Sequence, residues 1–208
     1  MTHPPHTSTP SLDVLLARFP VERPPSSSAD AAVTIVLREG LSELEVLLIE
    51  RASHPDDPAS GQVALPGGHV SKDDGNLVQT ALRELEEEVG LSRQDLADDP
   101  RYVSTVHARR FGLDVGVFVA RLGSEGRTPA PRSPSEVARV FWLPRSSLET
   151  TRQVERETSV GTLPVHATVH DGHVLWGFTR RVLRDFFDLP HEKEAFGSVF
   201  APKASPPS

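Results

Sequence analysis

The segment from Asn76 to Gly90 is the part of the sequence that most constrains the fold of this chain. It contains no proline and is rich in leucine, glutamate and alanine, which favour helix. Asn76 is a suitable N-cap, and Gly90 can adopt the left-handed conformation that commonly ends a helix. The sequence therefore predicts one well-bounded helix between these two residues.

The predicted helix has an apolar side and an acidic side. The apolar stripe consists of Val78, Leu82, Leu85 and Val89. Glu84, Glu87 and Glu88 recur three and four residues apart and therefore share another side. Like charges at this spacing destabilise a helix by about 0.2–0.5 kcal/mol per pair, and negative charge near the C-terminal end opposes the helix dipole. A bound cation would offset both costs.

Two interpretations of the acidic side are open from the helix alone. An exposed glutamate face needs no ligand, and charged runs are commonly solvated. The preceding residues favour a metal site instead, because the Gly67-Gly68 turn can bring a backbone carbonyl to the ion and Asp74 adds another carboxylate. Mg²⁺ and Mn²⁺ prefer such oxygen ligands, so we expect one of these ions as the cofactor.

The remaining chain alternates short apolar runs with one further helix. Asp171-Gly172 predicts a two-residue hairpin turn, and the helical spacing in 177–188 predicts a second helix. The expected strands are 32–37, 44–49, 63–65, 102–107, 113–122, 137–143, 166–170 and 173–176. This mixture predicts an α/β fold in which a mixed β-sheet lies between helices.

Proline clusters indicate the domain limits. Nineteen prolines are present, and many lie near the two ends. We expect an N-terminal tail with a short helix in residues 1–29, one domain in residues 30–190, and a flexible C-terminal tail in residues 191–208.

Composition excludes several classes of function. The formal charge of −7 provides no electrostatic footprint for nucleic acid, and the sequence contains no apolar stretch of the roughly 18 residues that a membrane helix needs. Cysteine is absent, which removes disulfides and thiolate chemistry. The N-terminus lacks the pattern of a secretory signal, so we expect a cytoplasmic protein that acts on small molecules.

The acidic helix and its approach resemble the Nudix box, G-x5-E-x7-R-E-U-x-E-E-x-G-U, in which U is aliphatic. The second half matches at every fixed position: Arg83, Glu84, Leu85, Glu87, Glu88, Gly90 and Leu91. In the first half, Gly68 is followed after five residues by Asp74 instead of glutamate, and eight residues instead of seven precede Arg83.

These differences are similar to the coenzyme A pyrophosphatase branch of the family, which carries GQVAFPGG, an aspartate, and ALRE after the longer spacing. Here the corresponding residues are Gly61–Gly68, Asp74 and Ala81–Glu84. The LRxHxGQ pattern that usually precedes them in the branch is absent from residues 51–60. The substrate could therefore also be ADP-ribose, a dinucleotide or a nucleoside triphosphate.

The resemblance implies an α/β/α sandwich and a metal-dependent attack of water on a diphosphate. It assigns Glu84, Glu87, Glu88 and the Gly67 carbonyl as metal ligands. The general base is one of the box glutamates or Glu136. Arg51, Gly68 and His69 are the substrate-binding candidates.

The partner expected from this resemblance is a small-molecule nucleotide, with neither nucleic acid nor membrane involved. A homodimer is one option for the assembly. A non-catalytic Nudix-fold module that binds a nucleotide is the competing functional class, and the retention of all three box glutamates argues against it.

Overall fold

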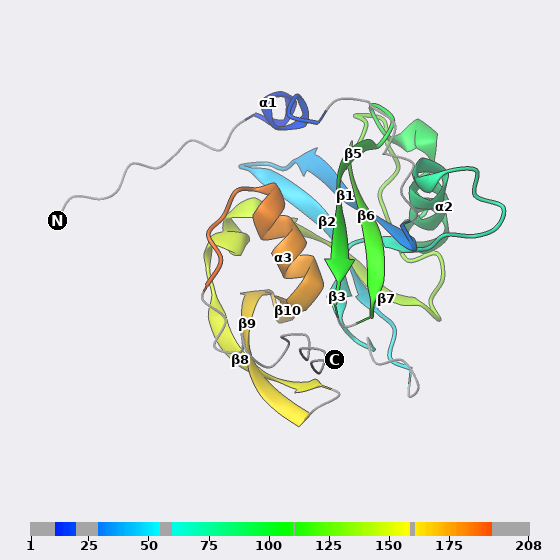
Figure 1. Cartoon of the computed structure of the whole chain (residues 1–208). Helices are drawn as coiled ribbons and strands as arrows, with labels where there is room; N and C mark the ends of the chain where they lie inside the picture. Colours follow the sequence, from blue (N-terminus) through cyan, green and yellow to red (C-terminus); the bar gives the residue numbers. More distant parts are fainter. Residues whose placement is uncertain (1–10, 20–28, 55–59, 110, 159–160, 193–208) are drawn as a thin grey trace, which may run out of the picture.

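The computed structural model describes residues 11–19, 29–54, 60–109, 111–158 and 161–192 (Figure 1). The α-helices are α1 (Leu12–Leu16), α2 (Leu77–Val89) and α3 (Gly177–Phe186). Short 3₁₀ helices are η1 (Arg93–Asp95) and η2 (Arg145–Glu149). The strands are β1 (Ala31–Glu39), β2 (Leu44–Arg51), β3 (Val63–Ala64), β4 (Gly67–His69), β5 (Arg101–Ala108), β6 (Leu113–Arg121), β7 (Val137–Pro144), β8 (Arg152–Thr158), β9 (Gly161–His170) and β10 (His173–Trp176).

Seven strands form the main sheet. Its central order is β3-β2-β1-β6-β5, with β4 paired to β1 and β7 paired to β2. The pairing of β1 with β6 is parallel, and the other pairings are antiparallel. The predicted mixed sheet is therefore confirmed.

Helices cover both faces of this sheet (Figure 1). In β1, Ile35 and Leu37 belong to the cluster that includes α1 and α3, whereas Val36 between them belongs to the cluster under α2. This alternation follows from the two-residue period of a strand, and it buries apolar side chains on both sides. The result is the α/β/α arrangement expected from the sequence.

Helix α2 begins and ends where the sequence predicts. The Asn76 side chain accepts a hydrogen bond from the Gln79 N–H at 3.0 Å, and Gly90 has a φ of +74°. All four residues of the predicted apolar stripe pack against the core, Leu85 and Val89 fully buried and Val78 and Leu82 half-buried. Thr80, Ala81 and Glu88 are buried as well. The buried side therefore also includes one of the glutamates.

A separate three-stranded sheet, β10-β9-β8, extends from the domain. The β9–β10 hairpin was predicted, and Asp171 and Gly172 have φ values of +47° and +82°, as a tight hairpin turn requires. Strand β8 was not predicted, because Val154 is its single aliphatic residue and no apolar alternation marks it. Its pairing with β9 instead stabilises an otherwise polar segment.

Two segments outside residues 30–190 contact the folded core. In α1, Leu12 and Leu15 are each 1% exposed and belong to the cluster shared with α3. Past residue 190, Glu192 pairs with Arg180 at 3.0 Å and with Arg184 at 3.3 Å. The predicted domain limits stay a prediction, and most of both predicted tails (residues 1–10, 20–28 and 193–208) lies outside the described residues.

We predict that α1 is an integral part of the domain's stability. Leu15→Ala removes a buried side chain and should lower the free energy of unfolding by about 2–4 kcal/mol in urea titrations. Val14→Ala is the matched control, since Val14 is 61% exposed and its loss should change stability by about 0.5 kcal/mol or less. Equal effects of the two substitutions would contradict this role of α1.

Candidate active site

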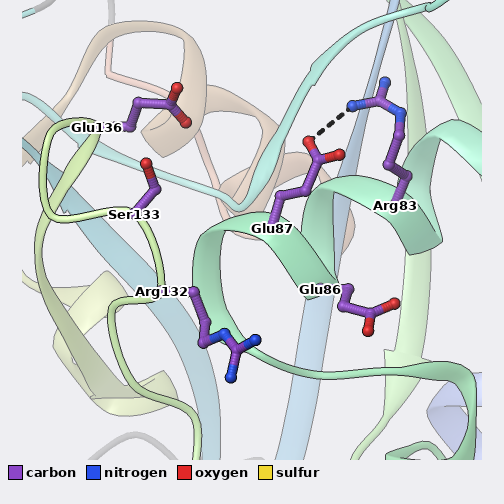
Figure 2. A pocket seen from close by; sticks show the side chains of 6 residues that line it. All are labelled: Arg83, Glu86, Glu87, Arg132, Ser133 and Glu136. Atoms are coloured by element: carbon purple, nitrogen blue, oxygen red, sulfur yellow. Dashed lines mark hydrogen bonds and ion pairs between the residues drawn. The ribbon is translucent and has the colours of Figure 1, made fainter.

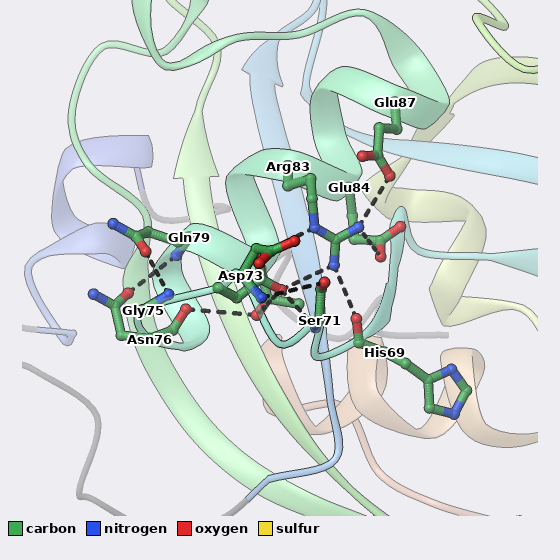
Figure 3. Close-up of polar contacts among 11 residues, drawn as sticks. His69, Ser71, Asp73, Gly75, Asn76, Gln79, Arg83, Glu84 and Glu87 are labelled. Carbon is green, nitrogen blue, oxygen red and sulfur yellow. Dashed lines mark hydrogen bonds and ion pairs between the residues drawn. The ribbon is translucent and has the colours of Figure 1, made fainter.

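The guanidinium of Arg83 joins the acidic helix to the loop before it (Figure 3). It donates to both carboxylate oxygens of Asp74 at 3.0 Å and to the carbonyl of His69 at 2.9 Å. On the helix it donates to Glu84 at 2.7 Å and to Glu87 at 3.0 Å. Arg83 therefore orients Glu87, and it also fixes the loop.

Asp74 serves as the anchor of that loop. Besides Arg83, it accepts hydrogen bonds from the Ser71 N–H at 2.8 Å and the Thr80 hydroxyl at 2.9 Å. The hydrogen bonds from Arg83 hold the pKa of Asp74 well below its usual range. Asp74 is thus ionised and fully engaged in tying β4 and its loop to α2.

Gly67 and Gly68 allow β4 to lie between β1 and α2. A Cβ on Gly67, whose φ is +151°, would lie 2.2 Å from the Ala32 carbonyl oxygen. A Cβ on Gly68 would lie 2.6 Å from a carboxylate oxygen of Glu84. Neither position can hold a larger residue without displacing backbone or a functional side chain.

The backbone of Gly67 faces away from β1. Gly67 is opposite Val33. In the adjacent pair the Thr34 N–H donates to the Pro66 carbonyl, and three pairs along on the other side the Val70 N–H donates to the Asp30 carbonyl. In an antiparallel ladder bonded and non-bonded pairs alternate, so Gly67 occupies a non-bonded position. Its N–H donates instead to Glu88 at 2.9 Å. The same alternation directs its carbonyl away from β1.

Glu88 is a buried carboxylate, with 4% of its surface exposed. Burial raises its pKa to about 8, although the hydrogen bond from Gly67 acts in the opposite direction. The charges of Glu84 and Glu136 raise this pKa further, while Arg51 lowers it. The charges of Glu84, Glu136 and Arg51 are therefore all felt at the Glu88 carboxylate.

Glu84 and Glu87 differ in their surroundings. Glu84 has 13% of its side chain exposed, and burial raises its pKa. Glu87 has 55% exposed and is held by Arg83. Within the described part of the chain, no three histidine or acidic side chains already lie in positions that hold a metal ion. The structure thus brings Glu84 and Glu88 together and leaves Glu87 turned toward Arg83.

The remaining candidates lie at the border of this cluster. Glu136 is exposed on the loop before β7, and its carbonyl accepts a hydrogen bond from the Ala52 N–H at 2.8 Å. Arg51 ends β2, and its charge acts on Glu88. His69 is exposed, and its imidazole points away from Arg83 (Figure 3).

A hollow of about 600 Å³ opens between α2 and the loop of residues 130–136 (Figure 2). It is lined by Arg83, Glu86, Glu87, Arg132, Ser133 and Glu136. Arg132 and Ser133 were not among the predicted site residues. Nothing in their local sequence distinguishes them from an ordinary polar loop, and only the folding of this loop onto α2 brings them to the site.

The contacts of Asp74 predict a pH-dependent contribution to stability. Asp74→Asn should lower the free energy of unfolding by about 1–3 kcal/mol at neutral pH, because Arg83 loses its charged partner. Folding lowers the Asp74 pKa from about 3.9, so this contribution is complete above that value and is lost as the pH falls toward the folded pKa. The stability difference from wild type should therefore stay constant above about pH 4 and narrow progressively as the pH falls below it.

Urea titrations at several pH values measure this difference. Asp73→Asn is the matched control, since Asp73 is the exposed neighbour and should show little effect at any of these pH values. A difference for Asp74→Asn that stays constant with pH would contradict the proposed anchoring by an ionised Asp74.

Comparisons with known proteins agree with this geometry. A family model described as the NUDIX domain matches residues 28–161. Nudix hydrolase 15, mitochondrial, of Arabidopsis thaliana is 32% identical over 176 residues, which cover 78% of this chain and 59% of that protein. The uncharacterized Nudix hydrolase NudL of Salmonella typhimurium is 31% identical over 190 residues, which cover 86% of this chain and 94% of that protein.

A solved structure shows the same fold. The MutT/nudix family protein from Enterococcus faecalis has a TM-score of 0.52 and 18% identity, and the match covers 87% of this chain and 70% of that one. The family model covers more than half of the chain and includes the whole acidic helix. The chain therefore belongs to the Nudix family and is a hydrolase of the pyrophosphatase type.

Proposed function

We propose that the chain is a divalent-metal-dependent pyrophosphohydrolase that cleaves the diphosphate linkage of coenzyme A or its derivatives. The observation that carries the chemistry is Glu88, a buried carboxylate beside Glu84 and hydrogen-bonded to the Gly67 N–H. Burying a carboxylate costs free energy unless a cation or several donors compensate it. A cation bound here would compensate both glutamates.

The residues present fit a divalent ion by their chemistry. Nudix hydrolases generally use divalent cations. We assign Glu84, Glu87, Glu88 and the Gly67 carbonyl as the ligands, all of them oxygen donors of the kind that Mg²⁺ or Mn²⁺ takes. Glu87 is exposed enough to turn from Arg83 toward an ion. When bound, such an ion neutralises diphosphate charge and lowers the pKa of water.

Other side chains would bind the substrate and keep the ligands in place. The charge of Arg51 acts on the buried Glu88, and its guanidinium can pair with phosphate oxygens, for which guanidinium geometry is suited. Gly68 and His69 border the same site from β4. Arg83 holds Glu84 and Glu87 toward one side of α2 and thereby preorganises two of the carboxylates that would bind the metal ion.

The reaction needs a base that removes a proton from the attacking water. The water oxygen forms a bond to phosphorus, the bond from phosphorus to the bridging oxygen breaks, and the bridging oxygen leaves on the other phosphate. Glu136 is exposed at the edge of the hollow, within electrostatic reach of Glu84 and Glu88, and can accept the proton. A box glutamate is the alternative acceptor.

Support for coenzyme A comes from the resemblance of Gly61–Gly68 and Asp74 to that branch of the family. The segment Gly61–Gly68 includes β3 and the start of β4, where Gly67 donates to Glu88 and Gly68 lies against Glu84. The missing LRxHxGQ pattern supports the second candidate, a Nudix hydrolase for another nucleoside diphosphate derivative. Part of the segment where it would occur, residues 55–59, lies outside the described residues.

The expected partner is a small nucleotide substrate. Among the helices of the described residues, none has the length and apolar character needed to cross a membrane. The cytoplasmic location and the homodimer stay predictions.

Replacing the buried carboxylate tests the metal-site assignment. Glu88→Gln keeps the shape and an acceptor for the Gly67 N–H, and we expect turnover to fall by about a hundredfold or more with thermal stability retained. Glu86→Gln is the control on the same helix, because Glu86 is exposed and is not assigned as a ligand. Turnover that survives Glu88→Gln would refute the assignment, and a Mg²⁺-induced thermal shift lost in this variant would support it.

A substrate screen tests the choice of coenzyme A. The purified chain would be assayed with Mg²⁺ and with Mn²⁺ on coenzyme A, ADP-ribose, dinucleotides and nucleoside triphosphates, with products separated by chromatography. We expect the highest kcat/KM for coenzyme A, with products 3′,5′-ADP and 4′-phosphopantetheine. Negligible cleavage of coenzyme A beside fast cleavage of ADP-ribose would instead identify the second candidate.

A further inference from the structure

Arg132 is an arginine at the hollow that the proposed catalytic roles do not use. The hollow has three acidic lining residues, Glu86, Glu87 and Glu136, and two arginines. Arg83 already donates to four partners on α2 and its loop. For the exposed guanidinium of Arg132, the described residues provide no hydrogen bond or ion pair. Its charge is therefore available to a ligand.

The backbone beside Arg132 is fixed to the end of α2. The Arg132 N–H donates to the Glu88 carbonyl at 3.0 Å, and the Ala130 N–H donates to the Val89 carbonyl at 3.1 Å. Carbonyls in the last turn of a helix have no hydrogen-bond donor within the helix. The N–H groups of the loop supply the missing donors. They couple the loop directly to Glu88.

The stem of Arg132 also has a defined course. A Cβ on Gly90 would lie 3.1 Å from Cγ and 3.2 Å from Cδ of Arg132, so the stem passes closely over this glycine. Beyond it, the Ser133 carbonyl accepts hydrogen bonds from the N–H groups of Glu136 and Val137 at 2.9 and 2.8 Å. This loop brings both Arg132 and Glu136 to the lining of the hollow, and the Arg132 side chain extends away from Ser133 and Glu136 (Figure 2).

From this geometry we infer that Arg132 is a specificity residue that binds a phosphomonoester of the substrate, separate from the diphosphate that is cleaved. Arginine matches phosphate oxygens with two parallel donors. The inference rests on the proposed function, under which the substrate carries such a group as the 3′-phosphate of coenzyme A. Arg132 is assigned neither as a metal ligand nor as the general base. Its contact with the substrate should therefore affect KM more than kcat.

A pair of substrates that differ in this phosphate tests the inference. We expect Arg132→Ala to lower kcat/KM for coenzyme A by about tenfold to a hundredfold, mainly through KM, and to change kcat/KM for dephospho-coenzyme A by about twofold or less. Arg132→Lys should restore part of the loss. Arg152→Ala, an exposed arginine on β8, is the control for the lost charge and should leave both substrates unaffected.

The outcomes separate this inference from the proposed function. An equal loss on both substrates would mean that Arg132 contacts the cleaved diphosphate, and no loss on coenzyme A would mean that it binds no phosphate; either result overturns the inference. If the wild type cleaves neither compound, coenzyme A is not the substrate. ADP-ribose and ADP-ribose 2′-phosphate then form the pair, and the same selective loss on the phosphorylated member is required.

Discussion

The guanidinium of Arg83 is the contact on which the site depends. Its donors reach Asp74 and the His69 carbonyl on one segment and Glu84 and Glu87 on another. Without it, three carboxylates would repel one another across a helix and a loop. With it, the loop that follows β4 and the acidic helix form one unit, and a charge-assisted network fixes their relative position.

The close approach of β4 to α2 explains why this unit includes a buried carboxylate. Gly67 and Gly68 have no Cβ, so the strand can lie against β1 on one side and against Glu84 on the other. The Gly67 N–H then reaches Glu88, which burial has shifted toward a pKa of about 8. Burying Glu88 beside Glu84 is unfavourable when both carboxylates are ionised. A bound cation would favour the ionised carboxylates, so this arrangement is suited to bind one.

The loop of residues 130–136, which lies far from α2 in the sequence, brings further site residues to the same helix. Its N–H groups satisfy carbonyls at the end of α2, and it carries Arg132 and Glu136 to the hollow. In our proposal, the glutamates that hold the metal ion and the residues that select the substrate are therefore both supported by α2. Stability of the helix end and specificity of the site are linked through these backbone bonds.

The acidic helix, its Asn76 and Gly90 ends, most strands and the Asp171-Gly172 turn could be predicted from the sequence, because each depends on local propensity and on short-range spacing. Strand β8 escaped prediction because its polar residues carry no apolar period and its stability comes from pairing with β9. Helical spacing also placed Glu84, Glu87 and Glu88 together, whereas the structure buries Glu88 and turns Glu87 to Arg83. The burial of Glu88 and the position of Arg132 depend on the tertiary structure, since both result from segments far apart in the sequence that meet at α2.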